Sequence, residues 1–96
     1  MLTGKQKRFL RSKANHLQPL FQIGKNGLTD AVIHQIEEAL EAKELIKVNI
    51  LQNCDEDKNE IAIKLAEKEG IYVVQVIGNI IVLYKESVEK KRIELP

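Results

Sequence analysis

Four consecutive residues, Gly24-Lys25-Asn26-Gly27, have the types and spacing of a loop that contacts phosphate. Glycine has no Cβ, so a glycine at each end allows a sharp turn and lets backbone N–H groups approach an anion closely. The loop follows an apolar run from residue 19 to 23, which predicts a short buried strand, and precedes a helix-start signal at Thr29. The motif by itself also fits a plain turn, which is the commoner meaning of a Lys-Asn-Gly sequence.

The distribution of charge favours a nucleic-acid contact over a plain turn. Every charged residue before Asp30 is basic: Lys5, Lys7, Arg8, Arg11, Lys13 and Lys25. Residues 30–96 hold the other nine of the 15 Lys and Arg with all 14 Asp and Glu, a net charge of −5, although the whole chain sums to +1. Such asymmetry is typical of proteins with a surface for nucleic acid or an anionic membrane. GxxG loops clamp nucleotides in the KH class of RNA-binding modules.

A first helix is expected to carry most of this positive charge. Thr3 and Gln6 have the spacing of a capping box, which predicts a helix from there to about Asn15. Helical periodicity places Phe9, Leu10, Ala14 and Leu17 on one side and Lys5, Lys7, Arg8 and Arg11 on a continuous arc of the other. Like-charged neighbours at this spacing slightly destabilise a helix, so the arc favours an anionic partner over a merely solvated face.

The remaining pattern predicts three more strands and two more helices. We expect a helix at 30–43, a strand at 45–51, a helix that begins at Asp57 and is ended by Gly70, and strands at 71–77 and 80–84. Gly78-Asn79 suits a hairpin turn with positive φ. The predicted fold class is α/β, a small mixed four-stranded sheet packed with helices in the order α-β-α-β-α-β-β. Strands joined through helices are expected to pair in parallel, and the hairpin adds one antiparallel pair.

The length and composition predict one small domain, residues 1–85, followed by a charged, exposed tail at 86–96. Deleting Val88 to Pro96 is therefore expected to cost less stability than a core mutation. A hydrophobic content of 44% with 30% charged residues suits a soluble protein, and no stretch has the roughly 20 apolar residues of a membrane span. Cys54 is the only cysteine, which excludes an internal disulfide. We expect a cytoplasmic protein.

No pattern of catalytic or metal-binding residues stands out. His16, His34 and Cys54 match no known spacing of metal ligands. The carboxylates of the second and third predicted helices lie at solvated positions without an adjacent nucleophile. We therefore expect no catalytic residue, no metal and no cofactor, and a protein that is not an enzyme.

Two blocks of sequence together resemble the CRM domain (chloroplast splicing and ribosome maturation) in its single-domain bacterial YhbY form. The first runs from Leu2-Thr3-Gly4-Lys5-Gln6-Lys7 to Ile23-Gly24-Lys25-Asn26-Gly27-Leu28-Thr29, and the second is Val74 to Gly78 followed by Ile81 to Lys85. The resemblance implies an RNA-binding module similar to the C-terminal domain of translation initiation factor three, with an extra N-terminal helix. It implies that Gly24, Lys25, Asn26 and Gly27 face RNA, with the basic first helix near them. Asn79 and Asn15 depart from the family's pattern, and His16 has no assignable role.

The leading hypothesis is a monomeric, non-catalytic protein that binds ribosomal RNA in precursors of the large ribosomal subunit and assists assembly. Its expected contacts are Gly24, Lys25, Asn26 and Gly27 in the loop with Lys5, Lys7, Arg8 and Arg11 in the helix. With only two Phe, two Tyr and no Trp, recognition by base stacking is disfavoured relative to backbone and shape recognition. The alternative is a protein-interaction adaptor that uses the acidic second helix and the tail on ribosomal proteins.

Overall fold

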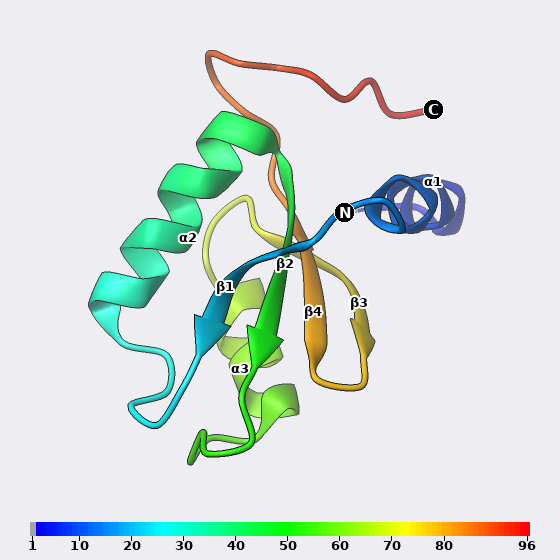
Figure 1. Cartoon of the computed structure of the whole chain (residues 1–96). Coiled ribbons are helices and arrows are strands. Elements are labelled where there is room, and N and C mark those ends of the chain that lie inside the picture. Colours follow the sequence, from blue (N-terminus) through cyan, green and yellow to red (C-terminus); the bar gives the residue numbers. More distant parts are fainter. Residues whose placement is uncertain (1) are drawn as a thin grey trace.

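The computed structural model describes residues 2–96 of the chain. Its elements follow one another in the predicted order, so the α-β-α-β-α-β-β arrangement is confirmed (Figure 1). They are α1 (Gly4–Ala14), β1 (Pro19–Ile23), α2 (Asp30–Lys43), β2 (Leu45–Ile50), α3 (Lys58–Ala66), β3 (Tyr72–Ile77) and β4 (Ile80–Tyr84). None of the helices in the described part of the chain is long and apolar enough to cross a membrane.

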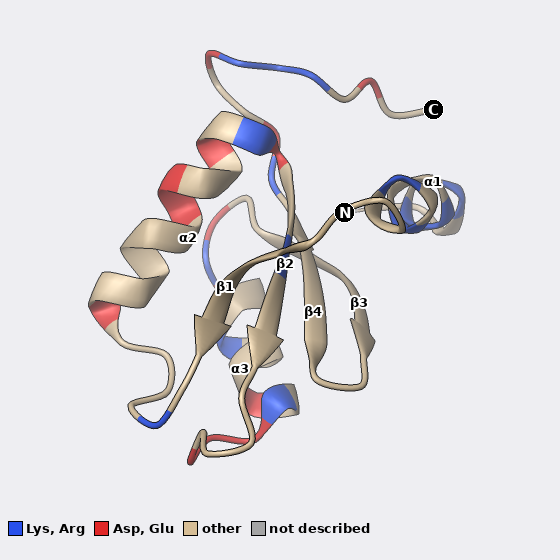
Figure 2. Cartoon of the chain, viewed as in Figure 1, with Lys and Arg blue, Asp and Glu red and all other residues tan. Residues whose placement is uncertain are grey.

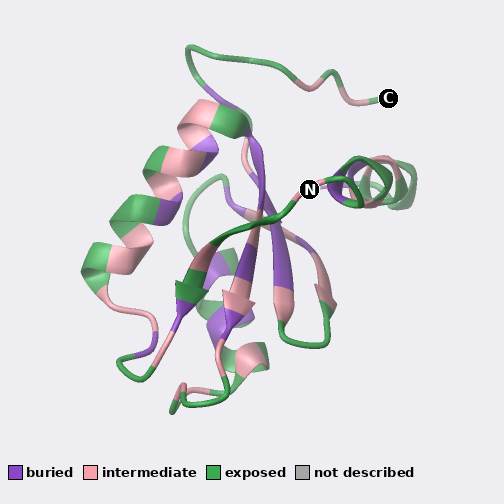
Figure 3. Ribbon diagram, in the orientation of Figure 1, coloured by how far each residue is buried: buried purple, intermediate pink, exposed green. Residues whose placement is uncertain are grey.

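The four strands form one mixed sheet in the order β1-β2-β4-β3. β1 and β2 are parallel, and β4 is antiparallel to both β2 and β3. The expectation of parallel pairing between β2 and β3 is wrong, because β4 lies between them, although the two strands run in the same direction. The reason is the apolar run from Ile81 to Tyr84, which is buried along its whole length and so occupies the centre of the sheet (Figure 3).

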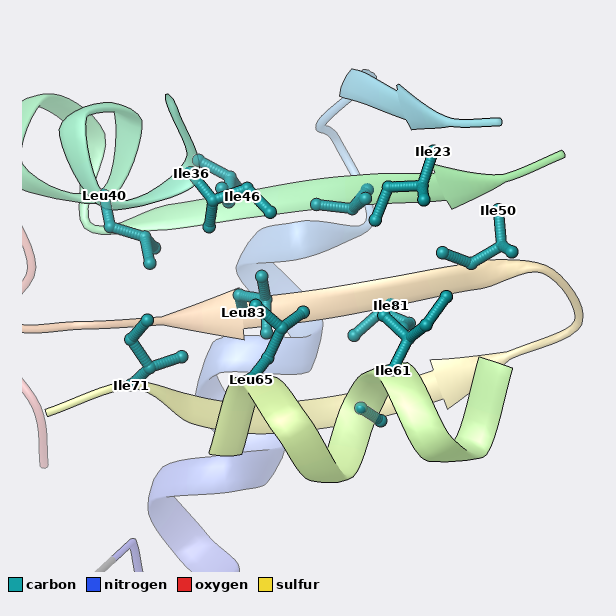
Figure 4. Close-up of a cluster of buried hydrophobic side chains, with 12 residues drawn as sticks. Ile23, Ile36, Leu40, Ile46, Ile50, Ile61, Leu65, Ile71, Ile81 and Leu83 are labelled. Carbon is teal, nitrogen blue, oxygen red and sulfur yellow. The ribbon is translucent and has the colours of Figure 1, made fainter. Parts of the chain in front are cut away.

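Each face of the sheet is covered by helices and has its own buried cluster. On one face, Ile36 and Leu40 of α2 and Ile61 and Leu65 of α3 pack against alternate residues of β2 and β4 (Figure 4). On the other face, Leu10 and Ala14 of α1 pack against the intervening residues, Leu45, Val82 and Tyr84. The alternation of side chains along the two central strands therefore supplies both clusters.

The predicted helix starts are present as hydrogen bonds. The Thr3 hydroxyl accepts from the Gln6 N–H at 3.1 Å, and the Gln6 side chain accepts from the Thr3 N–H at 3.0 Å, which is the predicted capping box. The Thr29 hydroxyl accepts from the Val32 N–H at 3.2 Å, and the Asp57 carboxylate accepts from the Asn59 N–H at 3.0 Å. These caps fix the first turns of all three helices.

Three local expectations need correction. β1 is an edge strand in which only Ile23 is buried and Leu20 is 46% exposed, so it is not a buried strand. α3 ends at Ala66, four residues before Gly70, whose φ of +82° belongs to the turn into β3. In the hairpin only Gly78 has positive φ, at +55°, and Asn79 does not.

The segment after β4 is charged and mostly exposed, as expected, but it is docked on the domain through Ser87, Ile93 and Leu95. Ser87 is 1% exposed, and Ile93 and Leu95 pack against the cluster beneath α1. The Gln6 side-chain amide donates to the Pro96 carbonyl at 3.3 Å, so the segment returns to the first helix. In Figure 1 it passes from the end of α2 across the top of the molecule towards α1.

Two glutamates at the end of α2 hold this segment. The Glu44 carboxylate is fully buried and accepts from the backbone N–H groups of Ser87, Arg92 and Ile93 at 2.8, 2.5 and 2.7 Å. Glu41 accepts from the Ser87 hydroxyl at 2.7 Å and from the next two backbone N–H groups at 3.0 and 3.1 Å. Glu44 also has a φ of +66°, which is uncommon for a residue other than glycine.

Candidate nucleic-acid interface

The Gly24 to Gly27 loop is a tight turn at the end of β1. The Gly27 N–H donates to the Gly24 carbonyl at 2.9 Å, which leaves Lys25 and Asn26 exposed at the tip. No hydrogen bond or ion pair within residues 2–96 uses the side chains or the N–H groups of Lys25 and Asn26. The tip can therefore offer one ammonium, one amide side chain and two backbone N–H groups to a ligand.

The two glycines of the loop serve different structural needs. Gly27 has a φ of +67°, and a Cβ there would lie 2.3 Å from the Glu56 Oε1 atom. A Cβ on Gly24 would make only ordinary contacts, 3.7 Å from Leu51 and 3.8 Å from Asn53. The fold therefore requires glycine at position 27, whereas nothing in the fold requires it at position 24.

Glu56, which the sequence patterns did not single out, braces the loop from the β2–α3 connection. Its carboxylate accepts from the Leu28 N–H at 2.8 Å and forms an ion pair with Lys64. The Lys64 hydrogen bond, followed by the one from Leu28, holds the pKa of Glu56 below its usual range. Glu56 lies in the acidic run 55–57, from which the sequence predicted only the helix cap at Asp57. Its hydrogen bond with Leu28 joins residues 28 apart, so it produces no periodic pattern in the sequence.

The cations of α1 form the second predicted set. Lys5, Lys7 and Arg8 are exposed and Arg11 is half-buried, while Leu10 and Ala14 on the opposite side are buried. α1 contains no acidic residue, and none of these four cations is in an ion pair within the described residues. Lys13 lies with its ammonium 5.3 Å from the centre of the Phe9 ring, over the apolar flank of the helix.

The structure does not bring the loop and the basic helix together. The loop follows Ile23, which pairs with Ile50 at one end of the sheet, whereas α1 packs near the Leu45–Tyr84 pair at the other end. Figure 2 shows the loop after β1 and α1 on different sides of the molecule, with the blue of α1 well separated from the blue of this loop. The implied nearness of helix and loop is therefore wrong, and the predicted residues form two separate surfaces.

His16, His34 and Cys54 have different surroundings in the fold. The His34 Nε2 atom lies 3.2 Å from the Glu38 Oε1 atom on the exposed side of α2. Cys54 is half-buried and packs against the core cluster that contains Ile36 and Leu40. His16 is exposed just after α1. Within residues 2–96, no group of three or more His, Cys, Asp or Glu side chains is placed to hold a metal ion.

Comparison with known proteins places this fold in one family. The model of the CRS1/YhbY (CRM) domain matches residues 2–85. The protein named Probable RNA-binding protein YqeI, from Bacillus subtilis, is 67% identical over all of both chains. A Haemophilus influenzae protein named RNA-binding protein is 44% identical over 99% of this chain and 95% of its own length.

A solved structure shares the architecture. The solution structure of the hypothetical protein SAV1595 from Staphylococcus aureus, which is proposed to bind RNA, superposes with a TM-score of 0.82. The two chains are 56% identical, and the match covers all of both. The sequence blocks, the element order and these similarities agree, and the chain belongs to the CRS1/YhbY (CRM) domain family.

Proposed function

We propose that this chain is a non-catalytic RNA-binding protein that binds ribosomal RNA in precursors of the large ribosomal subunit and assists their assembly. The observation that carries the proposal is the braced turn, whose tip presents Lys25, Asn26 and two unused backbone N–H groups. Backbone amides held in a fixed turn are suited to phosphate. The names of the family relatives support RNA as the partner. We further propose that it acts as a cytoplasmic monomer.

The Gly24 to Gly27 loop and the cations of α1 would both contribute to RNA binding. The loop has one free cation, so its contribution is close approach of the backbone to phosphate rather than a strong field. α1 carries cations without acidic neighbours, so it supplies most of the electrostatic attraction and the dependence on salt. Base stacking contributes little, because Phe21 packs on the core and Tyr84 is buried.

The adaptor hypothesis is weaker than its sequence basis suggested. It depends on the acidic face of α2 and on a free tail. The Glu41 and Glu44 carboxylates instead accept hydrogen bonds from the Ser87 hydroxyl and from backbone N–H groups of residues 87–93, so less acidic surface is available to a basic partner.

The test replaces both Lys25 and Asn26 by Asp, which changes the loop charge from +1 to −2. We expect a large loss of affinity for structured ribosomal RNA, measured by fluorescence anisotropy, and loss of co-sedimentation with large-subunit precursors. Both side chains are exposed and both glycines stay, so stability should change by less than about 0.5 kcal/mol.

A matched control is Gln35→Asp with Lys68→Asp. Both positions are exposed and lie outside the loop, and the net charge changes by the same −3. It should bind RNA nearly as the parent does. If the loop variant folds, binds and sediments like this control, the assignment of the loop is wrong and the adaptor hypothesis becomes the better one.

A further inference from the structure

The docked C-terminal segment completes a cationic pocket at the end of the sheet remote from the Gly24 to Gly27 loop. The pocket has a volume of about 420 Å³ and is lined by Lys13, His16, Lys43 and Arg92 above the apolar Leu45 and Ile93. No acidic side chain lines it. It draws on the end of α1, the end of α2 and the segment after β4, so no single stretch of sequence reveals it.

Arg92 is held in this pocket by its backbone. The Glu44 carboxylate accepts from the N–H groups of Arg92 and Ile93 at 2.5 and 2.7 Å, and Ile93 packs against the cluster that contains Leu45. The guanidinium is thus attached to a fixed point, and the described residues include no ion-pair partner for it. Ordering the chain before a ligand binds lowers the entropy cost of binding.

The neighbouring cations of the segment are placed differently. Lys91 pairs with Glu86 at 2.7 Å. Lys90 lines a separate surface depression together with Glu37, Glu38 and Glu41 of α2. Of the three consecutive cations at 90–92, only Arg92 lines the pocket with Lys13 and Lys43, and it also lines a second depression together with Glu86 and Glu94.

The dipoles of α1 and α2 explain part of this arrangement. Lys13 and Lys43 lie in the last turns of α1 and α2, where a cation stabilises the helix dipole. Helix dipoles do not explain the position of Arg92, which belongs to no helix. Its backbone N–H donates to the buried Glu44 carboxylate, 48 residues away in the chain. Gathering a third cation beside two others costs electrostatic energy. The buried Glu44 carboxylate offsets part of that cost, and an anion in the pocket would offset more of it.

We propose that this pocket binds a phosphate group, and specifically a backbone phosphate of the RNA that contacts the loop and α1. The inference rests on the proposed function, and it gives the C-terminal segment a part in RNA binding. An RNA held at both sites would reach along much of the protein, whose longest dimension is 37 Å. Arg supplies planar, bidentate donors for a phosphate, and Lys43 and Lys13 supply point charges.

The experiment compares two double variants that each remove two positive charges. Lys43→Gln with Arg92→Gln changes the pocket, and Lys90→Gln with Lys91→Gln changes the same segment outside it. The salt dependence of binding to structured ribosomal RNA is measured for both and for the parent. Loss of one phosphate contact should lower the log–log slope of the pocket variant by about 0.7 to 0.9, while the control keeps the parent's slope.

Three further measurements complete the experiment. Thermal unfolding checks that the segment stays docked, since Gln at position 92 keeps the backbone N–H that Glu44 accepts from. Lys13→Gln changes the pocket from α1 alone and should lower the slope in the same direction. Titration of the parent with inorganic phosphate, followed by amide chemical shifts at His16 and Arg92, tests for a free anion as the occupant.

The outcomes separate the two proposals. A parent that shows no salt-dependent RNA binding refutes the proposed function itself. A parent that binds, with equal slopes for the pocket and control variants, refutes the pocket while leaving the function standing. Saturable binding of inorganic phosphate combined with an unchanged RNA slope assigns the pocket to a small anion and overturns the RNA assignment.

Discussion

Gly24 and Gly27 bracket one turn but meet different surroundings, so the same substitution to Ala should have different consequences at each. At Gly27 the new Cβ would lie 2.3 Å from the Glu56 carboxylate, on a backbone with a φ of +67°. The left-handed conformation costs a residue with a Cβ about 1 to 2 kcal/mol. Displacing the carboxylate from the Leu28 N–H costs about 1 kcal/mol more, because a partly exposed hydrogen bond contributes modestly.

We therefore expect Gly27→Ala to lower the free energy of unfolding by about 2 to 3 kcal/mol. In a domain of this size that shifts the melting temperature down by roughly 10 to 20 °C. At Gly24 the new Cβ makes ordinary contacts, and the loss of unfolded-state freedom offsets any cost, so Gly24→Ala should stay within about 1 kcal/mol of the parent. Urea unfolding at neutral pH measures both.

A double-variant comparison and an RNA-affinity measurement test the different roles of Gly24 and Gly27. In a Glu56→Ala background, Gly27→Ala should cost less than in the parent, because only the backbone strain remains. RNA affinity is then measured on the folded Gly24→Ala variant, where a loss of binding without a loss of stability is expected if phosphate approaches the backbone there. Equal unfolding free energies for the two glycine variants would refute the assignment of Gly27 as the glycine that the fold requires.

Three further predictions concern the segment after β4 and α1. Deleting residues 88–96 should cost about 2 to 4 kcal/mol, because it uncovers apolar surface beneath α1 and leaves Glu44 with fewer donors; a loss near zero in urea unfolding would restore the exposed-tail interpretation. Burial alone raises the pKa of Glu44, but the hydrogen bonds from the N–H groups of Ser87, Arg92 and Ile93 hold that pKa below its ordinary value. The contribution of Glu44 to the free energy of unfolding should therefore be fully present above the unfolded-state pKa of about 4.3 and be lost as the pH falls further. Unfolding free energies measured from pH 7 downward should therefore decline less steeply in Glu44→Gln than in the parent, and equal declines would contradict the role of Glu44. Replacing Lys7, Arg8 and Arg11 of α1, which are exposed or half-buried, by Ala should weaken RNA binding gradually and reduce its salt dependence without unfolding the helix. Anisotropy titrations at several salt concentrations measure this dependence, and a log–log slope equal to the parent's would contradict the prediction.

The local elements of this protein could be predicted from the sequence because their signals are local. The capping box of Thr3 and Gln6 and the cap of Thr29 formed as expected, since each joins residues three apart. Helical periodicity correctly placed Leu10 and Ala14 on the buried side of α1. The turn of the Gly24 to Gly27 loop was also predictable, because glycine at φ > 0 follows from the chain's own sterics.

Only the tertiary structure decided how these elements sit together. β4 lies between β2 and β3 because it is the strand that is most buried on both faces. The rule that strands joined through a helix pair with each other does not take account of this difference in burial. The brace of Glu56 on the loop and the hold of Glu44 on residues 87–93 join positions 28 to 49 residues apart. A carboxylate that accepts from backbone N–H groups requires no particular side chain at those positions, so it leaves no mark in the sequence. The charged segment after β4 therefore resembled a solvated tail by composition, whereas its backbone hydrogen bonds place Arg92 beside Lys13 and Lys43.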